Sequence, residues 1–440
     1  MRLPHVLFLF VSISFLCSMM GCDSVSSIED PNKSHFIKFF GGDGDQTGQD
    51  LVALSDGTFI LFGTTRSSAA GSNSQWYLAK ADAKGNRIWE KTFGGTTDEE
   101  ASDIELTSDG RLVAVGNTYK TSTDRDVRIM TFTLDGDPLD SALIPILDNS
   151  GNVTKGDEDA ASVTETTDGF IIAGSTTYVS GKTGGIPGSS DPRDGLGIRV
   201  KKDLKPYQNG WPITETYGTY SDDVTKKIYQ VSDGFYLFGF SNSPNSGQTI
   251  ENYNVWYYKI GFTGTSLNNN YLGNQSEDEK PSSVSIAPPQ SGGGYILAGI
   301  TYNQSGAGSM YVLRLRSPLA FKASDDQFRR SLSIGLGSNL NERASVFASQ
   351  QEQGGFYVLT NEKSFNDNQN WILTKVNNDG GTAWNLPIVY GGEGPDSIGA
   401  VQELPDGRLV LIGTMRTGKS DTGELKLTLI KVNQDGKFLN

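Results

Sequence analysis

Apolar residues from residue 35 onward fall in short runs separated by polar turn residues, a pattern that favours strands over helices. The clearest runs are continuously apolar, as expected for strands that are covered on both faces. All but one end in glycine, which indicates a bend or a close backbone approach; Thr360 is the exception. The runs lie at residues 59–63, 112–116, 170–174, 236–239, 295–299, 356–360 and 409–413.

A tight turn precedes each of these runs. Asp-Gly between two apolar segments is the strongest short signal for a β-hairpin. Five copies carry it and two have a Gly-Gly pair in its place. The repeat length suits a four-stranded blade, so the sequence predicts an all-β, seven-bladed β-propeller. The turn residues are Asp56-Gly57, Asp109-Gly110, Asp168-Gly169, Asp233-Gly234, Asp406-Gly407, Gly293-Gly294 and Gly354-Gly355.

The two ends of the repeat region complement each other. Residues 35–42 end in Phe-Phe-Gly-Gly and match the last strand of a blade, residues 89–95. The final copy has three strands and lacks a fourth. We therefore expect the N-terminal strand to complete the last blade, because closing the ring removes two exposed sheet edges.

All six tryptophans occupy two repeated positions, in the third and fourth strands of a blade. An aromatic ligand platform and packing between blades are both compatible with this placement. Repetition at equivalent sites favours packing, because each tryptophan buries a large area. The tryptophans are Trp76, Trp256 and Trp371, and Trp89, Trp211 and Trp384.

The first 34 residues differ from the rest. Arg2 precedes an apolar stretch at 6–16 that is too short to span a bilayer, and Met19-Met20-Gly21-Cys22 follows it. This ending resembles the bacterial lipobox, in which the cysteine is lipidated. We expect a signal peptide at 1–21, a tether at 22–34 and the propeller at 35–440, held to a bacterial outer membrane through Cys22. An ordinary secretory signal with an incidental cysteine is the alternative.

Trp-x-Lys-Thr-Phe-Gly-Gly at 89–95, together with Thr-x-Asp-Gly and Gly-x-Thr, resembles a repeat of bacterial extracytoplasmic propellers. The resemblance is strongest to lipoproteins of Bacteroidetes-type organisms and covers residues 35–440. It implies a propeller fold and an exported location. It implies no activity that transfers residue by residue.

Charge and composition exclude several functions. A net charge of −14 disfavours nucleic acid as a partner. The chain has two histidines, one of them in the leader, and no phosphate-binding loop or EF-hand. His35 lies in the closing strand and is expected to pack there. We therefore predict a protein that is not an enzyme, and expect it to be a monomer without a cofactor.

Acidic residues stand ten positions before the turn aspartates. In a propeller this position begins the innermost strand, at one rim of the central channel, where the long loops between second and third strands also lie. Such a ring would bind a cation such as calcium, a cationic ligand or a sugar. Alternatively, each carboxylate accepts backbone N–H bonds in its own loop. The residues are Glu99, Glu158, Asp223 and Asp396, with Gln46 in the first copy and Glu342 and 277–279 in the irregular copies.

These observations favour a membrane-anchored propeller that binds a glycan, a peptide or a protein partner at the loop-bearing rim. Two other classes stay open. One is a structural component of the cell envelope. The other is a propeller enzyme, a lyase, hydrolase or quinoprotein, which the shortage of histidine disfavours.

Overall fold

The computed structural model describes residues 35–440 except 67–72, 122–123, 145–155, 178–192, 206, 208–212, 216–221, 243–251, 274–275, 307, 337–342, 353, 364–368, 393, 419–422 and 439–440. His35–Asn440 is one compact unit, and Met1–Ser34 is another. The expected signal peptide, Cys22 and the tether fall in Met1–Ser34, outside the described residues. Within the described residues, no helix is long and apolar enough to cross a membrane.

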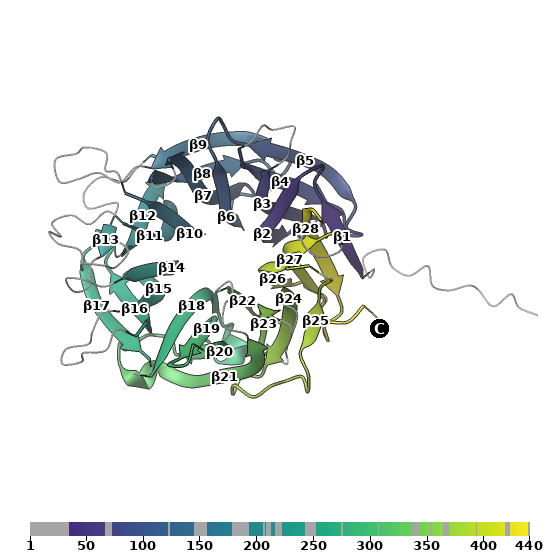
Figure 1. The fold of residues 1–440 in the computed structure, drawn as a ribbon. Helices are drawn as coiled ribbons and strands as arrows, with labels where there is room; N and C mark the ends of the chain where they lie inside the picture. The colour runs from purple at the N-terminus through teal and green to yellow at the C-terminus, as the bar shows by residue number, and fades with distance from the viewer. Residues whose placement is uncertain are drawn as a thin grey trace, which may run out of the picture. The chain divides into compact units, whose positions relative to one another are not determined.

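The described residues form seven four-stranded antiparallel sheets (Figure 1). The innermost strands are β2 (Asp45–Ala53), β6 (Glu99–Leu106), β10 (Glu158–Glu165), β14 (Asp223–Val231), β18 (Glu277–Ile286), β22 (Ala344–Ala348) and β26 (Ser397–Glu403). The second strands are β3 (Phe59–Arg66), β7 (Leu112–Thr121), β11 (Gly169–Thr176), β15 (Gly234–Ser241), β19 (Tyr295–Asn303), β23 (Phe356–Lys363) and β27 (Leu409–Arg416).

The outer half of each sheet follows in the same order. The third strands are β4 (Gln75–Ala81), β8 (Asp124–Phe132), β12 (Asp194–Lys201), β16 (Asn254–Ile260), β20 (Gly308–Leu315), β24 (Gln369–Val376) and β28 (Leu425–Val432). The outermost strands are β5 (Arg87–Phe93), β9 (Pro138–Ile144), β13 (Ile213–Glu215), β17 (Ser266–Leu272), β21 (Asp326–Leu336), β25 (Ile388–Tyr390) and β1 (Phe36–Phe40). We number the blades I to VII, from the sheet that starts with β2 to the sheet that starts with β26.

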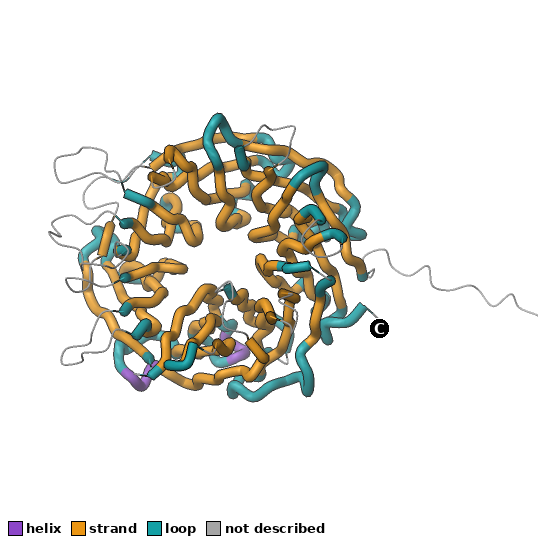
Figure 2. Tube along the Cα trace, viewed as in Figure 1, coloured by secondary structure: helices purple, strands orange, loops and turns teal. Residues whose placement is uncertain are grey.

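The ring closes as predicted. β1 pairs with β28, with Phe36 opposite Lys431 and Phe40 opposite Leu427, and so becomes the fourth strand of blade VII. Each innermost strand contacts the innermost strand of the next blade, and β26 contacts β2. Figure 2 shows a ring built mainly from strands joined by loops, and the only helical turns among the described residues are the short 3-10 turns Pro289–Ser291 and Ala323–Asp325. The prediction of a seven-bladed propeller is confirmed.

The hydrophobic core lies in the seams between blades. Phe62 and Trp76 of blade I pack in one cluster with Ile104, Ala114 and Phe132 of blade II. The second strands are buried along nearly their whole length, which explains their continuous apolar runs. Two neighbouring sheets therefore share each cluster, and a blade taken alone would expose both of its apolar faces.

The third-strand tryptophans serve this packing. Trp76, Trp256 and Trp371 are fully buried. The Trp76 indole N–H donates to the carbonyl oxygen of Glu100 in the next blade, at 2.9 Å, and its ring meets Phe62 edge-on. For this set the packing interpretation is confirmed. Of the fourth-strand tryptophans, Trp89 and Trp384 are partly buried against core clusters, and Trp211 lies outside the described residues.

A bulge interrupts most of the innermost strands at the same place. The pairing with the second strand shifts register between Gly48 and Asp50 in blade I, and equivalent shifts occur in blades II, III, IV, V and VII. Each shift leaves at least one residue without a cross-strand partner, which bends the strand and turns side chains that follow it. In blade VI the described part of β22 pairs without a shift.

The glycine that ends the apolar run in six of the blades lies inside the second strand and faces this bulge. A Cβ on Gly63 would lie 1.8 Å from the carbonyl oxygen of Thr47, and one on Gly116 would lie 2.0 Å from that of Glu100. A Cβ on Gly174, Gly239, Gly299 or Gly413 would also lie too close to a backbone carbonyl oxygen. The predicted close backbone approach is confirmed. Blade VI, whose described strands pair without a shift, is also the blade that has Thr360 at this place.

Gly116→Ala tests the close approach. The added methyl would collide with the Glu100 carbonyl and touch the Trp76 ring. We expect the variant to lose roughly 1–3 kcal/mol of unfolding free energy, measured by denaturant titration. Gly95→Ala is the matched control, because nothing lies within 4 Å of a Cβ built there. Equal stability of the two variants would contradict the steric account.

Candidate functional site

The predicted acidic residues lie at or next to the start of the innermost strands, at the edge where the second strands end. Glu99 stands opposite Thr118, and Glu158 opposite Thr176. The buried ones are Glu99, Glu158, Asp223 and Asp396, with Gln46 and Glu279 at the equivalent positions. In the predicted run 277–279, Glu277 and Asp278 are half-buried. Glu342 lies outside the described residues.

These carboxylates bond within their own blades. Glu99 accepts the Thr118 hydroxyl at 2.7 Å and pairs with Arg128 at 2.8 Å. Glu158 accepts the Thr176 hydroxyl at 3.0 Å. Asp396 accepts two backbone N–H groups, those of Gly392 and Arg416. The structure thus places them inside the blades and does not bring them together around the channel mouth, an arrangement that agrees with the structural alternative.

Burial also changes how two of them titrate. It raises the pKa of Glu158 to about 7, with Asp126 and Asp124 adding to the effect. It raises the pKa of Asp396 to about 6, against the lowering effect of its two backbone hydrogen bonds. Their ionisation therefore opposes folding at neutral pH.

The side chains that face the channel come from the next positions along each innermost strand. Glu100, Asp103 and Glu105 in β6 are half-buried, whereas Ala101 and Ile104 are buried between blades. The bulge at Ser102 adds one residue to the alternation. As a result, two residues next to each other in the sequence, Ser102 and Asp103, both line the channel.

Two cavities occupy the channel, and they meet at the level of the bulges. The turn-side chamber, of about 320 Å³, is lined from the bulges toward the Asp-Gly turns. The loop-side chamber, of about 440 Å³, is lined from the bulges toward the start of the innermost strands. The lining residues that they share are Gln49, Ser102, Ala161, Lys226, Ser282 and Arg343.

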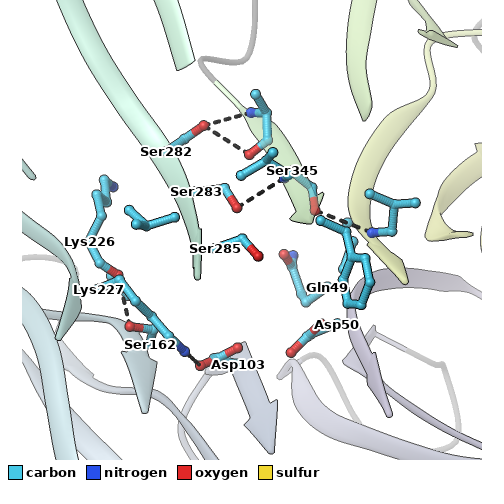
Figure 3. A pocket seen from close by; sticks show the side chains of 18 of the residues that line it. Gln49, Asp50, Asp103, Ser162, Lys226, Lys227, Ser282, Ser283, Ser285 and Ser345 are labelled. Atoms are coloured by element: carbon cyan, nitrogen blue, oxygen red, sulfur yellow. Dashed lines mark hydrogen bonds and ion pairs between the residues drawn. The ribbon is translucent and has the colours of Figure 1, made fainter. Parts of the chain in front are cut away.

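Polar side chains cover the wall of the turn-side chamber. Figure 3 shows Lys226 and Lys227 on one side, Asp103 and Asp50 next to each other below, and serines above. These serines are Ser282, Ser283, Ser285 and Ser345, from blades V and VI. The chamber therefore offers both hydroxyl groups and charged groups of either sign to its interior.

In several blades, one side chain of the innermost strand accepts a hydrogen bond from the backbone of the next blade. Asp50 accepts the backbone N–H of Ile104 at 3.1 Å, and Asp103 accepts that of Val163 at 2.8 Å. Ser283 and Ser345 occupy the equivalent position and accept the N–H groups of Val346 and Val401. A serine thus makes the same hydrogen bond as an aspartate, so this contact alone does not require a charge.

The charges of the turn-side chamber interact strongly. Lys227 lies 2.7 Å from Glu105 and 3.4 Å from Asp103, and donates to the Val163 carbonyl oxygen. Burial would lower the pKa of Lys227, but Asp103 and Glu105 outweigh it and raise that pKa. Burial and the neighbouring Asp103 raise the pKa of Asp50 well above its usual range. The Asp50 carboxyl group therefore favours its protonated form.

The loop-side chamber has a different set of charges. Glu100 accepts the Tyr119 hydroxyl at 2.5 Å, and Asp159 accepts the Asn117 side-chain amide at 2.8 Å. Arg343, from blade VI, extends past the small residues of blade VII to Gln49 of blade I. Its guanidinium group donates to both the side-chain oxygen and the backbone oxygen of Gln49. A further cavity of about 460 Å³ near the start of β2 and β6 shares Gln49 and Glu100 with this chamber.

The described residues contain no group of three or more His, Cys, Asp or Glu side chains that could hold a metal ion. What the channel offers is a set of hydroxyl, amide, carboxylate, ammonium and guanidinium groups. Such a set suits a small polar ligand held by several hydrogen bonds.

Sequence reasoning missed the channel-facing residues for a physical reason. It selected Glu99 and Glu158 because they recur at the same distance from the turns. Their neighbours Glu100 and Asp159 vary from blade to blade and carry no repeat signal. Because side chains alternate along a strand, a buried acid predicts that the residue after it faces the channel. The bulge then shifts this alternation by one residue, so it does not identify the channel-facing residues further along the strand.

A scan against protein-family models gives no match, and neither does a comparison with curated proteins. Solved structures do match. Extracellular domains 1–2 of Drosophila Semaphorin 1a align with a TM-score of 0.50 at 8% identity, over 91% of this chain and 88% of that chain. The plexin A4 extracellular region aligns with a TM-score of 0.49 at 11% identity, over 89% of this chain and 50% of that chain. The likeness is one of fold alone.

A Penicillium chrysogenum alpha-L-arabinanase, solved with arabinobiose, aligns with a TM-score of 0.45 at 12% identity, over 90% of this chain and 97% of that chain. Our prediction that the chain is not an enzyme is contradicted by the presence of glycosidases among these structures. The error lay in treating histidine as necessary, because glycosidases commonly work with two carboxylates.

Glu158→Gln tests the burial of the predicted acids. The unfolded chain releases the Glu158 proton near the ordinary pKa of 4.5, whereas the folded protein holds it to about 7. The stability that protonated Glu158 contributes is therefore full below the unfolded pKa and is lost as pH rises through the folded one. Glutamine keeps the acceptor for Thr176 and stays neutral, so we expect the variant to gain on the order of 2 kcal/mol over the parent between pH 4 and pH 8.

Thermal unfolding across this pH range measures the effect. Asp140→Asn, on the exposed face of β9, is the control and should leave the pH profile unchanged. A Glu158→Gln profile parallel to that of the parent would contradict the burial argument.

Proposed function

We propose that this chain is an exported bacterial lipoprotein whose propeller binds a ligand at the loop-bearing mouth of its channel. The lipobox-like ending at Cys22 and the polar stretch after it support the lipid anchor. The repeat that resembles bacterial extracytoplasmic propellers supports an outer-membrane location. The anchored propeller would then present its mouth to molecules outside the cytoplasm.

The loop-side chamber carries the binding proposal. Side chains from all seven blades line a space of about 440 Å³, within the range of small-molecule sites. Ala101, Ala160, Ala161 and Ile398 are the only apolar residues among those that line it. A purely structural channel has no need of such a wall, because apolar side chains or serines would fill the ring at lower desolvation cost.

The loops support the same end of the channel. The second strands end and the third strands begin at this rim, and many residues of the connections between them fall outside the described part of the chain. The opposite rim carries the short turns at Gly57, Gly110 and Gly407. Variable loops on a rigid scaffold are a common place for recognition.

Cys22→Ser tests the anchor. Without its thiol the chain would have no site for the lipid, so we expect it to move from the membrane fraction to the soluble fraction of the envelope. Labelling with a radioactive fatty acid followed by fractionation measures both steps. Retention of Cys22→Ser in the membrane at the level of the parent would contradict lipid anchoring.

Ala161→Phe tests binding at the mouth. Ala161 lines both chambers at the bulge of blade III, and a phenylalanine there would occupy ligand space. We expect hits from a panel of oligosaccharides and peptides, scored by thermal shift, to be lost in this variant. Ser141→Phe on exposed β9 is the matched control and should keep them. Hits that survive Ala161→Phe would place the binding surface elsewhere.

A further inference from the structure

The charged side chains of the loop-side chamber are separated by sign. Glu100 and Asp159, from blades II and III, provide its carboxylates. Lys226 and Arg343, from blades IV and VI, provide its cations. Of the other lining residues, none is charged. The chamber wall thus has an acidic arc and a basic arc.

The turn-side chamber also has charges of both signs, but it does not keep them apart. Its carboxylates, Asp50, Asp103 and Glu105, come from blades I and II, and Lys227 comes from blade IV. There Lys227 bridges to Glu105 and Asp103, so the opposite charges meet directly. The separation between arcs is therefore a property of the loop-side chamber in particular.

The fold does not require these charges. By strand pairing, Thr47 and Ser397 occupy the position of Glu100 and Asp159 in blades I and VII. At the bulge, Lys226 corresponds to Gln49, Ser102, Ala161 and Ser282 in other blades. Neutral side chains thus fill the same places in the same ring. Grouping like charges also costs energy that alternating them around the ring would avoid.

The acidic arc and Arg343 are held in place before any ligand arrives. Tyr119 fixes Glu100, and Asn117 and Arg125 approach Asp159 at 2.8 Å and 3.5 Å. Arg343 donates to Gln49 through two of the five N–H groups of its guanidinium, which leaves donors for a carboxylate. Fixed charges bind an oppositely charged group with little loss of side-chain entropy.

We infer that the loop-side chamber binds a small zwitterion, of the class of short peptides with free termini. The ammonium group would lie against Glu100 and Asp159, and the carboxylate against Lys226 and Arg343. A neutral sugar would present no charged group to either arc. This inference deepens the proposed binding function and rests on it.

Four related probes test the charge requirement, with calorimetric titration of the full chain purified in mild detergent. They are triglycine, N-acetyltriglycine, triglycine amide and maltotriose. We expect triglycine to bind, and loss of either terminal charge to weaken Kd by about tenfold or more. Maltotriose is expected not to bind. Equal affinity for triglycine and its two blocked forms, or absence of triglycine binding, would overturn the inference.

Two variants assign the arcs. Lys226→Gln removes the positive charge and introduces glutamine, the residue that stands at the bulge of blade I. Glu100→Gln combined with Asp159→Asn removes the negative charges and keeps the oxygens that accept from Tyr119 and Asn117. Lys226→Gln should weaken triglycine binding, by no more than blocking the ligand carboxylate does, because Arg343 remains. The same variant should leave the affinity for triglycine amide unchanged. The variant that combines Glu100→Gln with Asp159→Asn should bind triglycine and N-acetyltriglycine with the same Kd.

Asp140→Asn on the outer strand β9 controls for net charge and should change no Kd. If maltotriose binds the parent, loses binding in Ala161→Phe and keeps it in Lys226→Gln, the mouth binds a ligand and only the zwitterion inference is wrong. If hits from the oligosaccharide and peptide panel survive Ala161→Phe, binding at the mouth itself is wrong.

Discussion

Each blade has a second strand that is apolar on both faces, and a four-stranded sheet cannot cover itself. Phe62 and Trp76 pack against the next blade, just as blade VII packs against β2. Every blade therefore depends on a neighbour on each side, and only a closed ring gives the first and last blades the neighbours they need. The pairing of β1 with β28 adds hydrogen bonds at the place where the ring would otherwise open.

The ring has a second consequence at its centre. The innermost strands of adjacent blades meet without backbone pairing between them, so side chains such as Asp50 and Ser283 supply hydrogen bonds to the next blade. The bulges turn additional residues toward the channel, and the glycines opposite them allow the two strands to approach. The ring therefore requires a polar side chain at these positions, and serine meets that requirement as well as aspartate does. The polar channel wall that results then becomes available for binding.

The repeat provides an internal comparison that a single-copy fold lacks. Serine at 283 and 345 makes the bond that aspartate makes at 50 and 103. The fold therefore does not need the charge of the aspartates. It does not need the charge of Lys226 either, because Gln49 and Ser282 occupy the equivalent position in other blades. Departures from the repeat indicate function better than its regularities, because the regularities mostly serve folding.

The sequence by itself determined the blade count, the strand order, the closing strand and the packing role of the third-strand tryptophans, since all of these follow from local patterns that recur. It also located Glu99, Glu158, Asp223 and Asp396 at the start of their strands. Only the tertiary structure decided where their side chains lie. Whether a residue in an innermost strand faces the channel or the seam depends on the bulge, and the bulge is a matter of pairing with a second strand. For the same reason the channel charges became visible as two arcs only once the ring had brought distant blades together.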